Sequence, residues 1–103
     1  MKKQRIYKYP VASVPSIVAG ESFEVKVKFP KGAQFLSCQR QKSERDMLCM
    51  WAIVDPDEEE IEEKTFVIYG TGWTIMHDLN KMHHICTLNI DDVFIYHVFL
   101  LDD

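Results

Sequence analysis

Polar and apolar residues alternate most regularly from Ser22 to Phe29. This segment reads SFEVKVKF, so every second residue is apolar and the residues between them are charged. A period of two predicts a β-strand with one buried face and one solvent-exposed face. Lys26 and Lys28 should therefore lie together on the exposed face.

Two further runs predict strands in the middle of the chain. Pro30-Lys31-Gly32 has the composition of a turn and precedes residues 34–41, so this segment is predicted to form a hairpin with the first strand. The next run, residues 47–54 (MLCMWAIV), is apolar throughout. An apolar run without a polar face is typical of a strand covered on both sides, so it should be interior.

The C-terminal half continues the strand pattern. The strands predicted there are residues 65–69, 73–76, 82–90 and 93–101. The last run is apolar on both faces apart from His97, which predicts a second interior strand, and Asp91-Asp92 marks the turn before it. A helical turn fits only residues 58–64 or 77–82, and neither has the apolar spacing of a core helix.

The N-terminal segment is predicted to be extended. Residues 5–9 form an edge strand that Pro10 ends, and residues 11–20 (VASVPSIVAG) form an extended connection.

Seven or eight short strands predict an all-β fold, either an antiparallel sandwich or a small, partly open barrel. The 103 residues fit a single domain. So short a chain has little material to cover two sheet faces, so we expect a homodimer or a higher homo-oligomer.

Composition excludes several classes of protein. The chain is 47% hydrophobic and 27% charged, as globular proteins are. No stretch approaches the roughly 18 apolar residues of a membrane-spanning helix, and no apolar signal segment follows the first residues, so we expect a cytosolic protein.

The three cysteines, Cys38, Cys49 and Cys86, are odd in number and lack a metal-binding spacing. They are predicted to be reduced, mostly buried thiols in a protein without zinc or another cofactor.

Charge is divided unevenly along the chain, whose net charge is -4. Residues 1–45 hold ten of the twelve Lys and Arg and three acids, whereas residues 46–103 hold two bases and thirteen acids. Seven of these acids lie in one run, residues 55–63 (DPDEEEIEE). Such a run is predicted to be a solvated loop, and its functional alternatives are a mimic of nucleic-acid phosphate or a contact for a basic partner. Nucleic acid itself is not expected as a partner.

The stretch YGTGW carries the main candidate binding residues. Between two predicted strands it fits a hairpin turn whose glycines, Gly70 and Gly72, adopt positive φ. It also fits a ligand-binding loop, because glycines leave backbone N–H groups accessible to an anion. In that case Thr71 lies at the ligand, and Tyr69 and Trp73 offer flat faces for a base.

Other candidate ligand residues are scattered along the chain. Trp51 offers a further aromatic ring, and Lys26, Lys28 and Arg40 offer positive charge. His97 lies in the apolar run FIYHVFLL. It is either a histidine at the edge of the core, hydrogen-bonded to backbone, or a polar group in a ligand pocket.

Signals for catalysis are sparse. The sequence has neither a nucleophile elbow nor a metalloprotease helix. His77-Asp78 could be a general base with its orienting carboxylate, or an ordinary loop dipeptide. His83 and His84 are adjacent and point to opposite faces of a strand, so they cannot share one metal ion.

Five short motifs resemble a family of small phage and prophage proteins. They are IYKYP, PKGAQFLSCQ, LCMWAIVDPD, FVIYGTGW and HVF. In that family a Pro-x-Gly-Ala turn, a W-A-x-V-D-P strand end, an I-Y-G-T-G loop and a terminal H-V-F recur in this order. The resemblance covers residues 6–99 and departs at Trp73, where the family has His. It implies a phage-encoded accessory protein without an assigned enzymatic activity.

Three functions follow from these observations. The first is a counter-defence protein that binds and sequesters a small nucleotide-type immune signal. The second is a protein inhibitor that covers a host defence factor and uses the acidic run as its contact. The third is a nucleotide-processing enzyme with His97 or His77 as its base. A sequestering protein needs a pocket of polar groups among aromatic rings, whereas an inhibitor needs an exposed patch.

Overall fold

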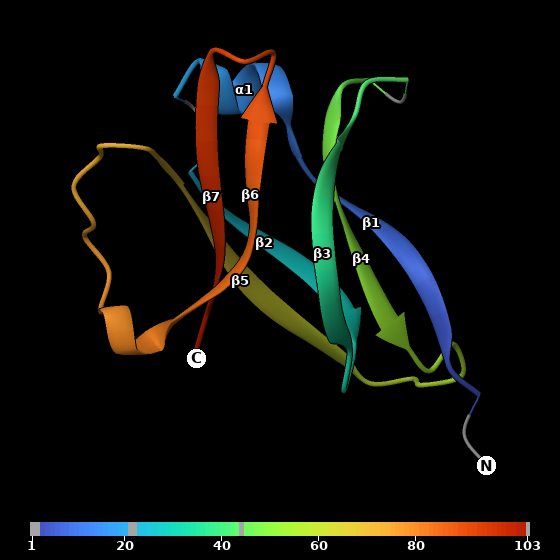
Figure 1. Ribbon diagram of the computed structural model, residues 1–103. Coiled ribbons are helices and arrows are strands. Elements are labelled where there is room, and N and C mark those ends of the chain that lie inside the picture. Colours follow the sequence, from blue (N-terminus) through green and yellow to red (C-terminus); the bar gives the residue numbers. More distant parts are fainter. Residues whose placement is uncertain (1–2, 21–22, 44, 103) are drawn as a thin grey trace.

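The computed structural model describes residues 3–20, 23–43 and 45–102. It is mostly β, with seven antiparallel strands in two sheets that form a sandwich not closed into a barrel (Figure 1). Sheet A has the order β1-β4-β3, and sheet B has the order β2-β5-β7-β6. The strands are β1 Arg5–Ser13, β2 Glu24–Pro30, β3 Gln34–Gln41, β4 Met47–Val54, β5 Ile61–Gly70, β6 Met82–Ile90 and β7 Phe94–Leu101. Two short helices are α1 Val14–Val18 and the 3-10 helix η1 Leu79–Lys81.

β4 is the middle strand of sheet A, as its uniformly apolar sequence predicted. Its Leu48 and Met50 side chains are buried in the core between the sheets, and Trp51 lies on the opposite face of the strand. β1 is an edge strand, which is also confirmed. Pro10 does not end β1. Instead, the pairing register with β4 shifts between Pro10 and Ala12, because a proline cannot donate a ladder hydrogen bond.

β7 lies between β5 and β6 in sheet B, which confirms the second predicted interior strand. Tyr96 and Val98 point into the core, so His97 lies on the outer face. β6 and β7 pair as a hairpin, and the predicted turn between them contains Asp91 and Asp92 at positive φ (54° and 59°). Aspartate visits this left-handed region more readily than most residues, which suits it to the turn.

The core between the two sheets is centred on aromatic rings. The Phe29 ring of β2 lies 4.7 Å from the Tyr9 ring, 4.8 Å from the Phe35 ring and 6.0 Å from the Phe66 ring, centroid to centroid. All of these contacts are edge-to-face, the arrangement that aromatic quadrupoles favour. The cluster joins β1, β2, β3 and β5, so it connects both sheets.

The predicted hairpin of β2 and β3 is not formed. β2 pairs with β5 in sheet B, and β3 pairs with β4 in sheet A. The turn after Pro30 therefore carries the chain from one sheet to the other, and the apolar faces of β2 and β3 meet across the core, where Phe29 packs on Phe35. Ser22, the start of the predicted strand, lies outside the described residues.

β5 is longer than the predicted strand at 65–69 and includes the last three residues of the acidic run. Glu63 lies directly opposite Lys28 of β2, and within β5 Glu62 forms a salt bridge with Lys64 at 3.2 Å. The opposite charges of Glu63 and Lys28 on neighbouring strands favour the pairing, so this part of the run belongs to a strand and not to a loop.

The predicted strand at 73–76 is absent. β5 already has β2 on one side and β7 on the other, so no edge of it is open to a hairpin partner. The stretch YGTGW is consequently the end of a strand followed by a turn, and not a hairpin. Of the two segments that could hold a helical turn, 77–82 contains η1 and 58–64 contains none.

Residues 11–20 are not an extended connection, because α1 occupies their centre. The Ser13 hydroxyl caps the helix by accepting a hydrogen bond from the Ser16 backbone N–H at 3.4 Å. Pro15 lies in the first turn, and Gly20 follows the helix at φ 79°.

No helix in the parts of the chain that the structure describes is long and apolar enough to cross a membrane.

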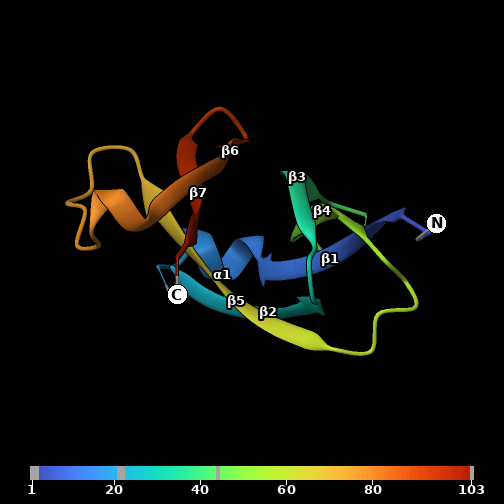
Figure 2. The same cartoon turned by 90° about the horizontal axis from the view of Figure 1, so that it is seen from below.

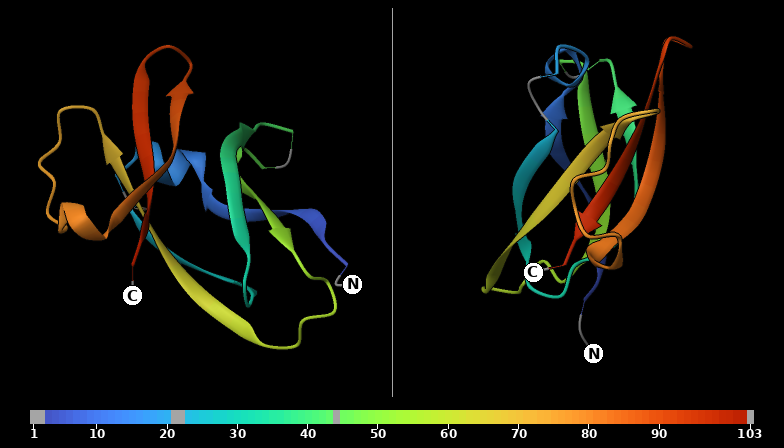
Figure 3. Two further views of the ribbon diagram at one scale, coloured as in Figure 1. Left: turned by 60° about the horizontal axis from the view of Figure 1, so that its bottom comes forward. Right: turned by 90° about the vertical axis from the view of Figure 1, so that its left-hand side faces the viewer.

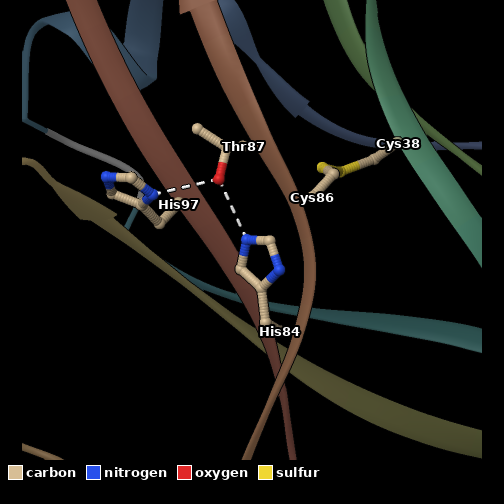
Figure 4. The surroundings of a disulfide bond; sticks show 5 residues. All are labelled: Cys38, His84, Cys86, Thr87 and His97. Carbon is tan, nitrogen blue, oxygen red and sulfur yellow. Dashed lines mark hydrogen bonds between the residues drawn. A yellow bond between two sulfur atoms is a disulfide. The ribbon is translucent and has the colours of Figure 1, made fainter.

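Two of the three cysteines form a disulfide, which corrects the prediction of reduced thiols (Figure 4). Cys38 of β3 and Cys86 of β6 are bonded, with their Cα atoms 5.9 Å apart, and Cys49 is buried and takes no part in the disulfide. β3 and β6 are edge strands of different sheets. The bond therefore closes one side of the sandwich covalently, a proximity that spacing along the chain does not reveal.

Candidate functional site

The segment that follows YGTGW folds back onto sheet B. The Tyr69 hydroxyl accepts a hydrogen bond from the Met76 backbone N–H at 3.1 Å and is hydrogen-bonded to Nδ1 of His77. On its other side, Nε2 of His77 lies 3.4 Å from the Glu24 carboxylate of β2. These contacts hold residues 71–81 on the side of sheet B that faces away from sheet A (Figures 1 and 2).

The YGTGW turn is fixed by backbone hydrogen bonds. The Trp73 N–H donates to the Gly70 carbonyl at 3.1 Å, and the Thr71 N–H donates to the Ile95 carbonyl at 3.1 Å. Gly72 has φ 89°, a conformation that favours glycine, whereas Gly70 is part of β5 and does not have positive φ. The expectation of positive φ is therefore correct for Gly72 alone.

The space above Gly70 is filled by the Trp73 indole. A Cβ atom on Gly70 would lie only 2.6 Å from Cε2 and 2.7 Å from Nε1 of Trp73. The indole also meets the Tyr96 ring edge-to-face at 6.0 Å and remains 47% exposed. Gly70 therefore lacks a side chain to admit this ring, so close approach of a ligand is not needed to explain the glycine.

His97 is part of a hydrogen-bonded chain of side chains on the outer face of sheet B. Its Nε2 lies 2.9 Å from Oγ1 of Thr71, and its Nδ1 lies 3.1 Å from Oγ1 of Thr87. The Thr87 hydroxyl also meets Nε2 of His84 at 2.9 Å (Figure 4). His97 is thus hydrogen-bonded to two side chains and not to backbone, and both of its ring nitrogens are used within the protein.

Six of the predicted ligand residues lie together around one small hollow of about 180 Å³. They are Tyr69, Gly70, Thr71, Gly72, Trp73 and His97, joined there by Ile75 and Phe99. The register explains this grouping, because Tyr69 is directly opposite His97 in β5 and β7. No residue lining the hollow carries a positively charged Lys or Arg side chain.

The other predicted ligand residues lie elsewhere. Lys26 and Lys28 are on β2, at the edge of sheet B, opposite Thr65 and Glu63. Trp51 is on sheet A, so it does not share a site with Trp73. Arg40 of β3 is held by two carboxylates.

Arg40 forms the centre of an ion cluster that joins the two sheets. Its Nε and Nη2 donate to the Asp46 carboxylate at 2.6 and 2.9 Å, and its Nη1 donates to Asp91 at 2.9 Å. Lys42 also contacts Asp91, at 3.2 Å. The hydrogen bond from Arg40 holds the pKa of Asp46 below its usual value, and the hydrogen bonds from Lys42 and Arg40 do the same for Asp91.

The lowered pKa values of Asp46 and Asp91 predict that the stability of the fold depends on pH. A carboxyl group whose pKa is lower in the folded than in the unfolded protein stabilises the fold above the unfolded pKa and loses that effect as pH falls through the folded pKa. Asp46→Asn should therefore be less stable than wild type at neutral pH. The difference should shrink as pH falls below about 4, the unfolded value. Urea unfolding at several pH values measures this, and a difference independent of pH would contradict it.

A group of exposed apolar side chains lies at the end of the sandwich where α1 and the β6–β7 turn are found. We define the apolar face as Val18, Trp73, Ile75, Val93, Phe94 and Ile95, each between 36% and 70% exposed. Five of its members line one hollow of about 330 Å³, and Ile75 lines the neighbouring one beside Trp73. α1 and the β6–β7 turn lie at the same end of the sandwich (Figures 1 and 3).

The sequence interpretation missed the apolar face. It placed residues 73–76 and 93–95 in strands, where apolar side chains are expected to be buried. The available signal was Asp91-Asp92, since a turn at that point leaves Val93 at the tip of a hairpin, where it is 70% exposed.

Among the residues that the structure describes, there is no group of three His, Cys, Asp or Glu side chains arranged to hold a metal ion.

The contact of Gly70 with Trp73 predicts the effect of adding one methyl group. Gly70→Ala should push the indole out of place, lower the free energy of unfolding by about 1–3 kcal/mol, and shift the Trp73 fluorescence to longer wavelength. In a Trp73→Ala background the same substitution should cost less than about 1 kcal/mol, because the clash is gone. A double-mutant cycle from urea unfolding measures this coupling, and additive effects would refute the contact.

Comparison with known proteins identifies a family without indicating an activity. Residues 2–103 match the family described as a domain of unknown function (DUF7352), so the chain belongs to this family. No curated protein and no solved structure matches the chain.

Proposed function

We propose that this member of the DUF7352 family is a phage-encoded accessory protein that works by binding another protein through the apolar face, without catalysis. The observation that supports the proposal is the concentration of exposed apolar side chains around Trp73 and Val93, at one end of the sandwich. Large apolar patches on soluble proteins are typically interaction sites, because their exposure to water is unfavourable. The phage origin rests on the resemblance of the five sequence motifs.

Binding of a nucleotide at the YGTGW turn is less well supported. A nucleotide phosphate needs positively charged or free N–H donors, and no Lys or Arg lines that hollow. The polar atoms of Thr71 and His97 are already hydrogen-bonded to one another, to Ile95 and to Thr87. The hollow of about 180 Å³ is also smaller than the range of roughly 300–1,000 Å³ that is usual for small-molecule sites.

A different hollow makes a sequestered nucleotide-type signal the second candidate function. It has a volume of about 510 Å³ on sheet A and is lined by Lys8, Arg45, Pro10 and Met47, among others. Trp51, one of the predicted ligand residues, lies directly opposite Lys8 in the pairing of β4 with β1. Cationic side chains next to an indole are a combination that binds nucleotides, through ion pairing and stacking.

One experiment distinguishes these two functions. The wild-type protein is incubated with lysate from bacteria whose phage defences are active, and is then recovered together with whatever it binds. If the proposal holds, the recovered material contains a host protein in a stable complex, and heat denaturation releases no nucleotide. Ile75→Ser/Val93→Ser should reduce recovery of that host protein by at least about tenfold, since each lost apolar contact is worth roughly 1 kcal/mol or more.

The matched control is Ile61→Ser. Ile61 is 58% exposed but lies at the opposite end of β5 from Gly70, outside the apolar face. This variant should recover the host protein as wild type does. Equal recovery by the apolar-face variant would contradict the proposal. A nucleotide released on heating, and lost in Trp51→Ala, would favour the second candidate.

A further inference from the structure

We infer that the apolar face receives a basic protein segment, one of whose apolar side chains inserts into the hollow between α1 and the β6–β7 turn. This inference rests on the proposed function and adds the chemistry of the partner. Two observations carry it: the shape and lining of the hollow, and the sign of the charges around it.

The hollow has a volume of about 390 Å³, enough for a large side chain together with part of its backbone. Its apolar lining consists of Val14, Pro15, Val18, Ala19, Ile90, Val93 and Phe94. Three of these, Val18, Val93 and Phe94, also line the hollow of about 330 Å³ next to Trp73. The two hollows therefore share a wall and form one indented apolar surface. Such a surface suits an aromatic or aliphatic anchor, the kind of residue that contributes most to protein–protein binding energy.

The charge that remains beside this hollow is negative. Asp91 and Asp92 lie in the turn between β6 and β7, whereas Asp78, Lys81 and Asp102 lie at the other end of this hairpin, near the start of β6 and the end of β7. Asp92, adjacent to Val93, is hydrogen-bonded to the Asn89 amide. Its carboxylate forms no salt bridge within the described part of the chain.

The positive charges on the β3 side of the hollow are already compensated by carboxylates. Arg40 and Lys42 are paired there with Asp46 and Asp91, so this cluster is close to neutral as a whole. The unpaired carboxylate of Asp92 then leaves a net negative rim. A partner with lysine or arginine next to its apolar anchor complements this surface, and an acidic partner is repelled.

The inference can be tested with three short synthetic peptides carrying a fluorescent label. The first has a central Phe-Leu pair flanked by lysines, the second has the same pair flanked by glutamates, and the third keeps the lysines but has Ala-Ala at the centre. Their dissociation constants for the full chain are measured by fluorescence anisotropy at low and at physiological salt. Wild type is compared with Val93→Ser, Asp92→Asn and the control Ile61→Ser.

We expect the lysine peptide with Phe-Leu to bind at least about tenfold more tightly than either of the others. Val93→Ser should weaken it about tenfold, and Ile61→Ser should leave it unchanged. Asp92→Asn should bind it more weakly at low salt and with less dependence on salt, because one rim charge is lost. Asparagine tolerates the φ of 59° at this position, so the turn should be preserved.

Three results would overturn the inference. Equal binding of the lysine and glutamate peptides would exclude charge complementarity, and equal binding of the Phe-Leu and Ala-Ala peptides would exclude the anchor. Neither result touches the proposed function, which is tested by recovery of a host protein from cells and by the loss of that recovery in Ile75→Ser/Val93→Ser. Concentration-dependent self-association in sedimentation, lost in Val93→Ser and not displaced by the lysine peptide, would show that a second copy of the chain occupies the face instead.

Discussion

Phe29→Ala is expected to lower the free energy of unfolding by about 3–5 kcal/mol, which would leave a domain of this size barely folded. Phe29 is 1% exposed, and its ring packs against Tyr9, Phe35 and Phe66 from three other strands. Removing the ring loses its burial and opens a cavity that these rigid neighbours cannot fill. The loss should be large because the cavity lies between the two sheets and no single strand can close it.

Urea unfolding followed by circular dichroism measures this loss. Phe23→Ala is the matched control, since Phe23 precedes the same strand and is 54% exposed. It should change the free energy of unfolding by less than about 1 kcal/mol. Similar losses for both variants would mean that the sheets do not pack around Phe29 as described.

Loss of the disulfide is expected to have the second large effect, about 4 kcal/mol. Cys38 and Cys86 are separated by 48 positions, and cross-linking a loop of that length removes conformational entropy from the unfolded chain. The bond also joins the edge strands β3 and β6 of different sheets, so its loss should allow this side of the sandwich to open more often.

The measurement is urea unfolding of the oxidised protein with and without a strong reductant. Reduction should lower the midpoint for wild type, whereas Cys38→Ala/Cys86→Ala should begin at the lower midpoint and not respond to reductant. Hydrogen exchange should then show faster exchange in β6 than in β5. A wild-type midpoint that does not change on reduction would contradict the predicted contribution of the bond.

Strands with a strong local pattern could be predicted from the sequence. The all-apolar runs of β4 and β7 identified the interior strands, because a strand covered on both faces needs no polar side. Partners were less accessible. β2 and β3 each have a clear pattern and a turn between them, yet they pair in different sheets, and this choice depends on β5 and β4, which follow later in the chain.

Short elements were misjudged where local signals compete. Ser13, Pro15 and Gly20 are capping and breaking residues of a helix, but α1 has only five residues and its apolar content suggested an extended segment. Residues 73–76 look like a strand, yet β5 has no free edge for them. The fold therefore overrides local propensity in both places.

Part of the candidate site could be predicted from the sequence, because its residues are neighbours along the chain or in adjacent strands. Tyr69 to Trp73 are contiguous, and His97 joins them through the register of two adjacent strands. Trp51 and Arg40 belong to sheet A, and their distance from this group depends on how the sheets pack. The disulfide and the exposure of Val93 are also tertiary features, which a strand pattern cannot reveal.

Binding of a protein through the apolar face is the central claim, and hydrogen exchange of the complex with the recovered host partner tests it most directly. We expect slower backbone exchange at residues 71–79 and 91–95 on binding, with the outer face of sheet A around Trp51 unchanged. Protection around Trp51 that spares both of these segments would contradict the claim.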